Sequence, residues 1–296
     1  MKSFTYQNPT SIQEALTLLA SPGLLAKPLA GGTDLLVQMR RGRFQPDVLV
    51  DVKRIPELTQ IIYDPVQGLT IGAAVICAAL CEHPEVQQLY PGLIDAVSII
   101  GGTAIQGRAT VGGNLCNAAP SGDSIPALIV LGATATVAKA NGQAGAKLFS
   151  IPVAEFCTAP GKTRLAKGDL LVAVHVPPPA PLSGAAYLRF TPRHEMDIAV
   201  AGAGVWVRLS EDRAIIAEAR IALSAVAPTP LPVQDAGDAL AGQPATDAVL
   251  AQAADLAMQA ARPIGDVRGT AEHRRHLVGV LVKRALNSAI RRAQHN

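Results

Sequence analysis

Thr110–Pro126 reads TVGGNLCNAAPSGDSIP, and the fold prediction for the whole chain starts from this stretch. Thr110 and Val111 have the character of a strand end. Gly112 and Gly113 then permit a tight turn, because glycine tolerates positive φ and lets the backbone approach a bulky group. Successive backbone N–H groups in such a turn form a concave site for an anion such as a diphosphate. We therefore expect a Cβ placed on Gly112 to point toward a ligand.

An earlier stretch, Leu29–Leu36, reads LAGGTDLL and has the same character. Each pair of glycines by itself is also compatible with a plain turn. Together they predict a nucleotide held from two sides by segments that are far apart in the sequence and close in space. The Thr33 and Thr110 hydroxyls can donate hydrogen bonds to phosphate oxygens, and Asn114 can brace the second turn.

Length and composition place the chain among globular proteins. At 296 residues it exceeds the usual size of one domain, and 49% apolar with 17% charged residues provides ample core. The net charge of +3 is slight and predicts neither nucleic-acid nor membrane binding. No apolar run of about twenty residues is present, so we expect no transmembrane segment.

The four cysteines indicate free thiols in a reduced compartment. Cys77, Cys81, Cys116 and Cys157 form no CxxC pair and no close set of four, which a zinc or iron–sulfur site would need. The N-terminus, MKSFTYQNPTS, has no apolar stretch typical of a signal peptide. A cytoplasmic location is therefore expected.

The order of predicted elements indicates an α+β protein of two domains. The proline run Pro177–Pro179 forms neither a helix nor a central strand and predicts a connector. We expect one domain at residues 1–177 and a smaller one at 178–296. Beyond the prolines, the strands 187–190, 199–209 and 214–227 precede helices at 235–241, 245–261 and 272–292, which predicts a three-stranded sheet with helices on one face. The last helix carries an apolar stripe, and its arginines, Arg274 included, are expected on a solvated face.

Three stretches carry a resemblance to a known family: AGGTDLLVQMRRG (30–42), TVGGNLCNAAPSGDSIPAL (110–128) and YLRFTPRHEMDIA (187–199). In order and spacing they resemble the FAD-binding medium subunit of the molybdenum hydroxylases, which include carbon monoxide dehydrogenase and xanthine dehydrogenase. The resemblance covers nearly the whole chain. It implies an FAD-binding domain of the vanillyl-alcohol-oxidase/xanthine-dehydrogenase type, followed by a C-terminal α+β domain of the CO dehydrogenase flavoprotein type.

The resemblance also assigns site residues, and in the family the two glycine segments contact FAD largely through backbone amides at the diphosphate. The residues that it implies are Ala30, Gly31, Gly32, Thr33, Asp34, Leu35, Ile100, Thr110, Val111, Gly112, Gly113, Asn114, Asp123, Leu171 and Arg189. No catalytic residue and no metal ligand are expected in this chain.

Four of these residues lie outside the glycine segments. Asp123 is expected at a hydroxyl of the ribose or ribityl chain, and as an alternative it caps the helix that follows. Ile100 and Leu171 match positions that pack near the flavin, and each is also a plain core residue. Arg189 stands where some relatives carry lysine near the flavin ring; the change leaves its contact open. Arg193–Asp197 resembles a loop beside the flavin, or else is a surface ion-pair cluster.

The resemblance implies an electron-transfer subunit rather than a free-standing catalyst. A partner large subunit with a molybdopterin cofactor would hydroxylate the substrate, and a small subunit with [2Fe-2S] clusters would pass electrons to this FAD. The acceptor would be NAD, a quinone or oxygen. Two alternatives stay open: a free-standing FAD oxidoreductase with its own organic substrate, for which Cys116 is the candidate covalent link, and a scaffold subunit that has lost the flavin.

Overall fold

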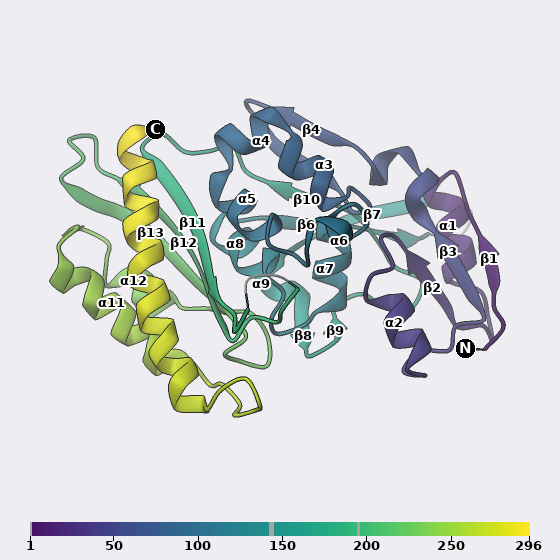
Figure 1. The fold of residues 1–296 in the computed structure, drawn as a ribbon. Coiled ribbons are helices and arrows are strands. Elements are labelled where there is room, and N and C mark those ends of the chain that lie inside the picture. Colours follow the sequence, from purple (N-terminus) through teal and green to yellow (C-terminus); the bar gives the residue numbers. More distant parts are fainter. Residues whose placement is uncertain (1, 142–144, 194–195) are drawn as a thin grey trace.

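The computed structural model describes residues 2–141, 145–193 and 196–296 (Figure 1). The chain begins with a small sheet of order β1-β3-β2, in which both pairings are parallel. Its elements are β1 (Thr5–Gln7), α1 (Ile12–Leu19), β2 (Ala26–Leu29), α2 (Leu35–Arg40) and β3 (Val48–Asp51). The Ser11 hydroxyl caps α1 by accepting from the Glu14 backbone N–H. Two short 3₁₀ turns, Val52–Arg54 and Pro56–Leu58, lead into the next layer.

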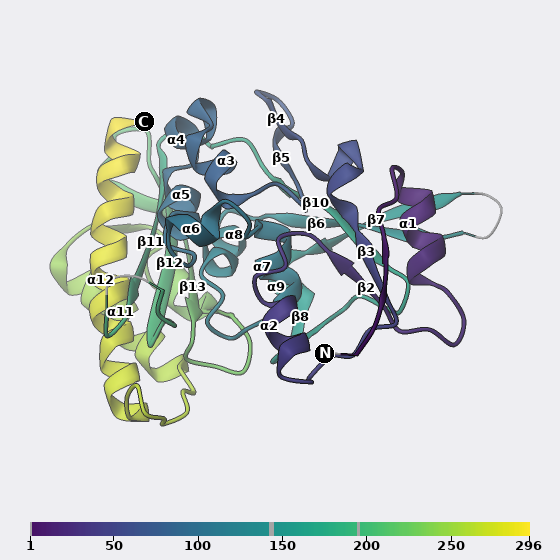
Figure 2. The same cartoon turned by 45° about the vertical axis from the view of Figure 1, so that its right-hand side comes forward.

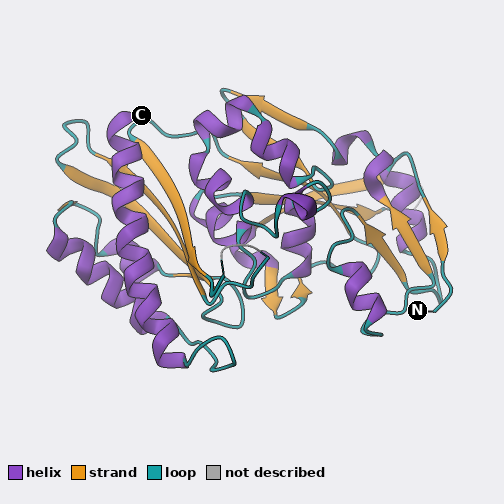
Figure 3. Ribbon diagram, viewed as in Figure 1, coloured by secondary structure: helices purple, strands orange, loops and turns teal. Residues whose placement is uncertain are grey.

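The second sheet is antiparallel throughout, in the order β4-β5-β10-β6-β7. Its strands are β4 (Ile61–Asp64), β5 (Gly68–Gly72), β6 (Thr134–Ala140), β7 (Ala146–Pro152) and β10 (Leu170–Val176). Short helices pack around it: α3 (Cys77–Glu82), α4 (Pro84–Leu89), α5 (Pro91–Val97), α6 (Thr103–Gln106), α7 (Val111–Asn117), α8 (Ser124–Val130) and α9 (Val153–Phe156). A ribbon of β8 (Cys157–Ala159) and β9 (Lys162–Thr163) follows α9. Figure 3 shows these short helices gathered at the middle of the molecule.

The third sheet is built from the C-terminal third of the chain. It has three long antiparallel strands, β11 (Ser183–Phe190), β12 (Ala201–Leu209) and β13 (Ile215–Ser224). Two short strands, β14 (Leu231–Pro232) and β15 (Gln243–Pro244), pair with β13. The helices are α10 (Gln234–Asp238), α11 (Asp247–Ala260) and α12 (Ala271–His295). The α+β class and the three long strands predicted from the sequence are confirmed, with β14 and β15 as additions.

Both faces of this third sheet are buried, whereas the sequence predicted helices on one face only. Helix α12 packs on one face, and α5 and α8 from the first half of the chain pack on the other (Figure 1). Alternate side chains accordingly enter different cores: Ala186 packs with the α12 side chains, and Ala185 with Trp206 and Val130. Burial on both faces explains why most consecutive residues of β11 and β12 are buried instead of alternating between buried and exposed.

The proline run lies between the second and third sheets, after β10 and before β11. The Tyr90 hydroxyl donates to the Pro177 carbonyl over 3.1 Å, so the connector is fastened to the first half of the chain. The domain division at 177/178 stays a prediction. None of the described helices is long and apolar enough to cross a membrane.

Arg274 was predicted on the solvated face of the last helix, and this was wrong. Its apolar neighbours on α12, such as Leu277 and Val278, are buried as expected, but Arg274 itself is only 3% exposed. Its Nη1 donates to the carbonyls of Val200 (2.7 Å) and Ala225 (3.2 Å), and its Nη2 pairs with Asp266 at 2.7 Å. One guanidinium therefore ties the start of α12 to the ends of two strands.

Replacing Arg274 with methionine should lower the free energy of unfolding by about 2–4 kcal/mol, because the Val200 and Ala225 carbonyls lose this donor. Urea unfolding followed by circular dichroism measures this. The control is Arg275→Ala on the next, exposed position of the same helix, which should cost less than about 0.5 kcal/mol. Equal costs for the two variants would contradict the structural role of Arg274.

Candidate functional site: two glycine segments in contact

The two glycine segments, Ala30–Leu35 and Thr110–Asn114, lie side by side although they are far apart in the sequence. A Cβ built on Gly31 would lie 2.0 Å from the Arg108 carbonyl oxygen and 3.1 Å from the Ala109 Cα. The helices that follow the segments also touch, since Gln38 Nε2 donates to Asn117 Oδ1 over 3.0 Å. Figure 2 shows α2 beside α7. The predicted proximity of the segments is present in the structure.

The first glycine segment leaves several backbone donors free. β2 ends at Leu29, Gly32 takes a φ of +77°, and α2 begins at Leu35. Within the described chain, the backbone N–H groups of Gly32, Thr33 and Asp34 donate to no protein acceptor. Thr33 is half-buried and Asp34 is exposed. A row of unpaired N–H groups in a glycine turn is suited to an anion.

The second glycine segment is a helix start and not the strand end and turn predicted from the sequence. Thr110 makes an isolated antiparallel bridge to Ile76 and then becomes the N-cap of α7, its Oγ1 accepting from the Gly113 N–H at 2.8 Å. The Val111 N–H faces the Val75 carbonyl across the bridge, whereas the N–H group of Gly112 has no acceptor among the described residues. A donor of the predicted kind is therefore present in this segment, but the first turn of a helix presents it.

The expected orientation of Gly112 was also wrong. A Cβ on Gly112 would lie 2.4 Å from the Ala73 carbonyl oxygen and 2.7 Å from the Ala73 Cα, so it would point into the protein. Gly112 is a close-packing position between α7 and the end of β5, and a larger residue there would displace α7. The role that the sequence assigned to Asn114 fits the structure better: Ser124 Oγ donates to Asn114 Oδ1 over 2.7 Å, which braces α7 against α8.

Asp123 is the centre of a buried polar cluster between α8 and the third sheet. Its side chain makes no capping hydrogen bond, so the cap alternative is not realised. Arg189 Nη1 lies 2.5 Å from Asp123 Oδ2, and the Tyr187 hydroxyl donates to Asp123 Oδ1 over 2.8 Å. Ser224 Oγ lies 3.1 Å from the same hydroxyl. Arg189, predicted beside a flavin ring, is thus held by Asp123.

Burial raises the pKa of Asp123 to about 6, against the opposing influence of Arg189 and Tyr187. Burial likewise raises the pKa of Tyr187 well above its ordinary value, so this hydroxyl stays a donor at neutral pH. Tyr187 and Ser224 were not predicted as site residues from the sequence. The period of two along a strand gives a signal for Tyr187, because it shares a face with Arg189 two residues later.

Ile100 and Leu171 both lie in the core beneath α7. Leu171 is 3% exposed on β10, and Ile100 packs half-buried against the same cluster, which includes Val111 and Leu115. Both are therefore core residues, and their contact with a cofactor stays a prediction. The segment Arg193–Asp197 was predicted to lie beside the flavin or to form a surface ion-pair cluster. Two of its residues, His194 and Glu195, lie outside the described residues.

Cys116 does not resemble a reactive nucleophile. It is a free thiol on α7, and burial raises its pKa to about 12. A thiol with so high a pKa is almost entirely protonated at neutral pH, and the thiolate is the reactive form. This disfavours a covalent flavin link at Cys116.

Replacing Arg189 with methionine should destabilise the chain by about 3–5 kcal/mol at pH 8, because the buried Asp123 loses its cation. Without Arg189 the folded-state pKa of Asp123 rises further above its unfolded value near 3.8, so the stability gained by protonation is lost as pH rises through that folded pKa. The cost should therefore be smaller at pH 5 than at pH 8 in urea unfolding.

Two further variants test the same cluster. Asp123→Asn combined with Arg189→Met should recover much of the loss, since the amide oxygen can still accept from Tyr187. Arg193→Met, whose side chain is 70% exposed, should change stability by less than about 0.5 kcal/mol. A loss that is independent of pH, or that the double variant does not relieve, would contradict the assignment.

The chain is similar to known proteins over nearly its whole length. The family described as FAD binding domain in molybdopterin dehydrogenase matches residues 2–179, and the CO dehydrogenase flavoprotein C-terminal domain matches residues 186–289. The carbon monoxide dehydrogenase medium chain of Hydrogenophaga pseudoflava is 34% identical over 97% of this chain and 96% of that protein.

The xanthine dehydrogenase FAD-binding subunit of Escherichia coli O157:H7 is 32% identical over 97% of this chain and 96% of its own length. A solved structure of the Hydrogenophaga pseudoflava carbon monoxide dehydrogenase, in a form that lacks the Mo-pyranopterin moiety of the molybdenum cofactor, superposes with a TM-score of 0.90 at 33% identity. That match covers 98% of both chains. The chain therefore belongs to the family of FAD-binding subunits of molybdopterin dehydrogenases, the oxidoreductases of the CO dehydrogenase and xanthine dehydrogenase type.

Proposed function

We propose that this chain holds one FAD between its two glycine segments and serves as the electron-transfer subunit of a molybdenum hydroxylase. The observation that carries the proposal is the contact of Gly31 with the Arg108–Ala109 backbone, which brings the unpaired N–H groups of the two segments together. A diphosphate carries negative charge on several oxygens, and backbone N–H groups converging on it supply the matching donors without a cation.

The residues divide into three roles in this proposal. The N–H groups of Gly32, Thr33 and Asp34, with that of Gly112, bind the diphosphate, and Val111 anchors the start of α7. Ala30, Gly31, Leu35, Thr110, Gly113 and Asn114 shape the two segments, and Ile100 and Leu171 pack beneath the flavin. The Thr33 hydroxyl, which has no hydrogen bond to another described residue, donates to a phosphate oxygen.

Asp123 and Arg189 act as a pair. Asp123 accepts hydrogen bonds from the Tyr187 hydroxyl at Oδ1 and from Arg189 at Oδ2. A remaining lone pair accepts from a hydroxyl of the cofactor. Arg189, fixed by that contact, places a cation on the flavin side of β11, where positive charge favours electron density on the reduced ring. Arginine in place of the lysine of some relatives suits this role, because its planar fork can pair with Asp123 and keep further donors free.

FAD supplies the redox chemistry, since it accepts electrons singly and releases them in pairs, and the chain supplies binding, orientation and charge. In this proposal the electrons come from [2Fe-2S] clusters on a small partner subunit and originate at a molybdopterin cofactor on a large partner subunit. They leave to NAD, a quinone or oxygen, and the complex works in the cytoplasm. The comparisons with medium chains and FAD subunits support this assembly, and the substrate is bound by another chain.

Replacing Thr33 with aspartate should lower FAD affinity at least tenfold, about 1.4 kcal/mol, because it puts a carboxylate among the phosphate donors. Flavin absorbance of the purified full chain, titrated with FAD, measures the dissociation constant. Thr33 is partly solvent-accessible, so the fold should persist, and its unfolding transition checks this. The control Thr59→Asp, at an exposed turn, should bind FAD as the unmodified chain does.

Two outcomes would contradict the proposal. One is unchanged FAD affinity in the Thr33→Asp variant. The other is turnover of an organic substrate by the purified chain alone, without partner subunits, which would favour the free-standing oxidoreductase. Unmodified chain that binds no FAD would instead favour the scaffold alternative.

A further inference from the structure

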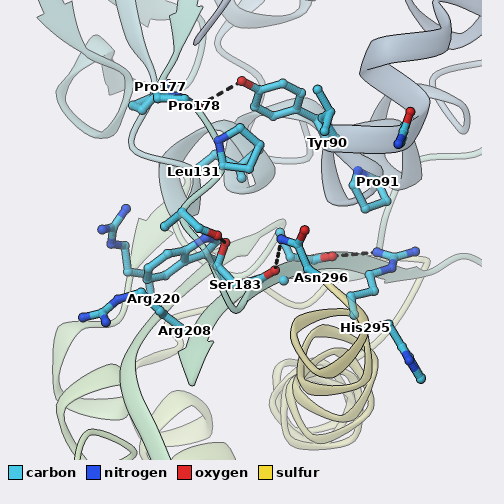
Figure 4. Close-up of a pocket in the computed structure, with 18 of the residues that line it drawn as sticks. Tyr90, Pro91, Leu131, Pro177, Pro178, Ser183, Arg208, Arg220, His295 and Asn296 are labelled. Atoms are coloured by element: carbon cyan, nitrogen blue, oxygen red, sulfur yellow. Dashed lines mark hydrogen bonds between the residues drawn. The ribbon is translucent and has the colours of Figure 1, made fainter. Parts of the chain in front are cut away.

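A second site lies between the third sheet and the first half of the chain, away from the glycine segments. A hollow of about 650 Å³ is bounded by Tyr90 and Pro91 at the start of α5, by the prolines 177–179, and by the C-terminal end of α12 (Figure 4). None of the residues proposed to hold FAD lines it. Its volume is within the roughly 300–1,000 Å³ of small-molecule sites.

The lining of this hollow is rich in positive charge. Arg208, Arg220, Arg291 and Arg292 line it, against the carboxylate of Glu218. Arg292 forms an ion pair with Asp95, with 2.6 Å between Nη1 and Oδ2. Arg208 is 3.7 Å from Glu218 without a hydrogen bond, and Arg291 has only a 3.3 Å contact with Ser288 among the described residues. Two guanidinium groups are thus available to an anion.

Arg220 is fixed beside the hollow by contacts with Trp206, Glu218 and Val130. Its guanidinium carbon lies 4.3 Å from the centre of the Trp206 ring, in a cation–π contact. Nε and Nη2 donate to Glu218 at 3.1 and 2.8 Å, and Nη1 donates to the Val130 carbonyl at 3.3 Å. The donor edges are therefore occupied and one face is covered, while the residue remains solvent-exposed. A guanidinium plane fixed in this way is a stacking surface for an aromatic ring.

We propose that this hollow binds a nucleoside phosphate. The planar base stacks on the Arg220 face opposite Trp206, and the phosphate pairs with Arg208 and Arg291, which supply charge-assisted hydrogen bonds. Figure 4 shows Arg208 and Arg220 on one side of the hollow, with the end of α12 at His295 and Asn296 across from them. Because both halves of the chain line the hollow, the ligand fastens them together. This site is independent of the FAD proposal.

The chain offers a direct readout, because Trp206 is its single tryptophan. Titrating the FAD-saturated full chain with AMP should change the Trp206 fluorescence, and calorimetry gives the dissociation constant. Adenosine lacks the phosphate and inorganic phosphate lacks the ring, so each should bind at least about tenfold more weakly than AMP. Raising the salt concentration should weaken AMP binding.

Matched variants locate the binding. Arg291→Ala should weaken AMP binding about tenfold, as expected for the loss of one charge-assisted hydrogen bond. The control is Arg284→Ala, which lies on the same helix, is exposed and does not line the hollow; it should leave binding unchanged. The Thr33→Asp variant should also bind AMP normally, which separates this site from an adenine subsite in the glycine segments.

Several results would overturn the proposal: no AMP binding at millimolar concentration, inorganic phosphate binding as tightly as AMP, or equal effects of Arg291→Ala and Arg284→Ala. Loss of AMP binding in Thr33→Asp would assign the nucleotide to the glycine segments instead. The same titration on the assembled complex completes the test. Binding retained there supports the site, and binding lost there shows that a partner subunit covers the hollow and overturns the proposal.

Discussion

The rest of the structure depends on one contact between backbones, that of Gly31 with Arg108 and Ala109. The Cβ of any other residue at position 31 would lie 2.0 Å from a carbonyl oxygen, so only glycine lets the two segments meet. The contact holds the small parallel sheet against the start of α7 and brings the two glycine segments side by side. Donors supplied by the main chain do not depend on side-chain rotamers, which suits a site that grips a diphosphate.

A second constraint joins the two halves of the chain through buried charge. Asp123 belongs to the helices of the first half, and Arg189, Tyr187 and Ser224 belong to the third sheet. A buried ion pair contributes little net stability by itself, but removing one partner is costly. The cluster therefore specifies how the third sheet docks on α8. It also keeps a cation next to the region where the flavin is proposed to lie.

Some features were predictable from local patterns and others were not. The long strands β11, β12 and β13 were predicted from stretches of strand-like composition, and the Ser11 cap of α1 is a local pattern. Strand β7, by contrast, is mostly exposed, and β4 alternates between half-buried and exposed positions, so neither has a clear apolar signal. The placement of Arg274 could not be predicted, because its burial depends on carbonyls at Val200 and Ala225 that only the folded sheet brings together.

The sequence by itself determined the family, the α+β class, and the two glycine segments with their order along the chain, because these depend on residue types and spacing. Only the tertiary structure decided that the second segment starts a helix, that Gly112 packs against Ala73, and that Asp123 pairs with Arg189 and Tyr187. The last two are contacts between residues far apart in the chain, and the helix start begins where Thr110 bridges to the distant Ile76. Such contacts are set by packing of the whole fold, which local propensity does not encode.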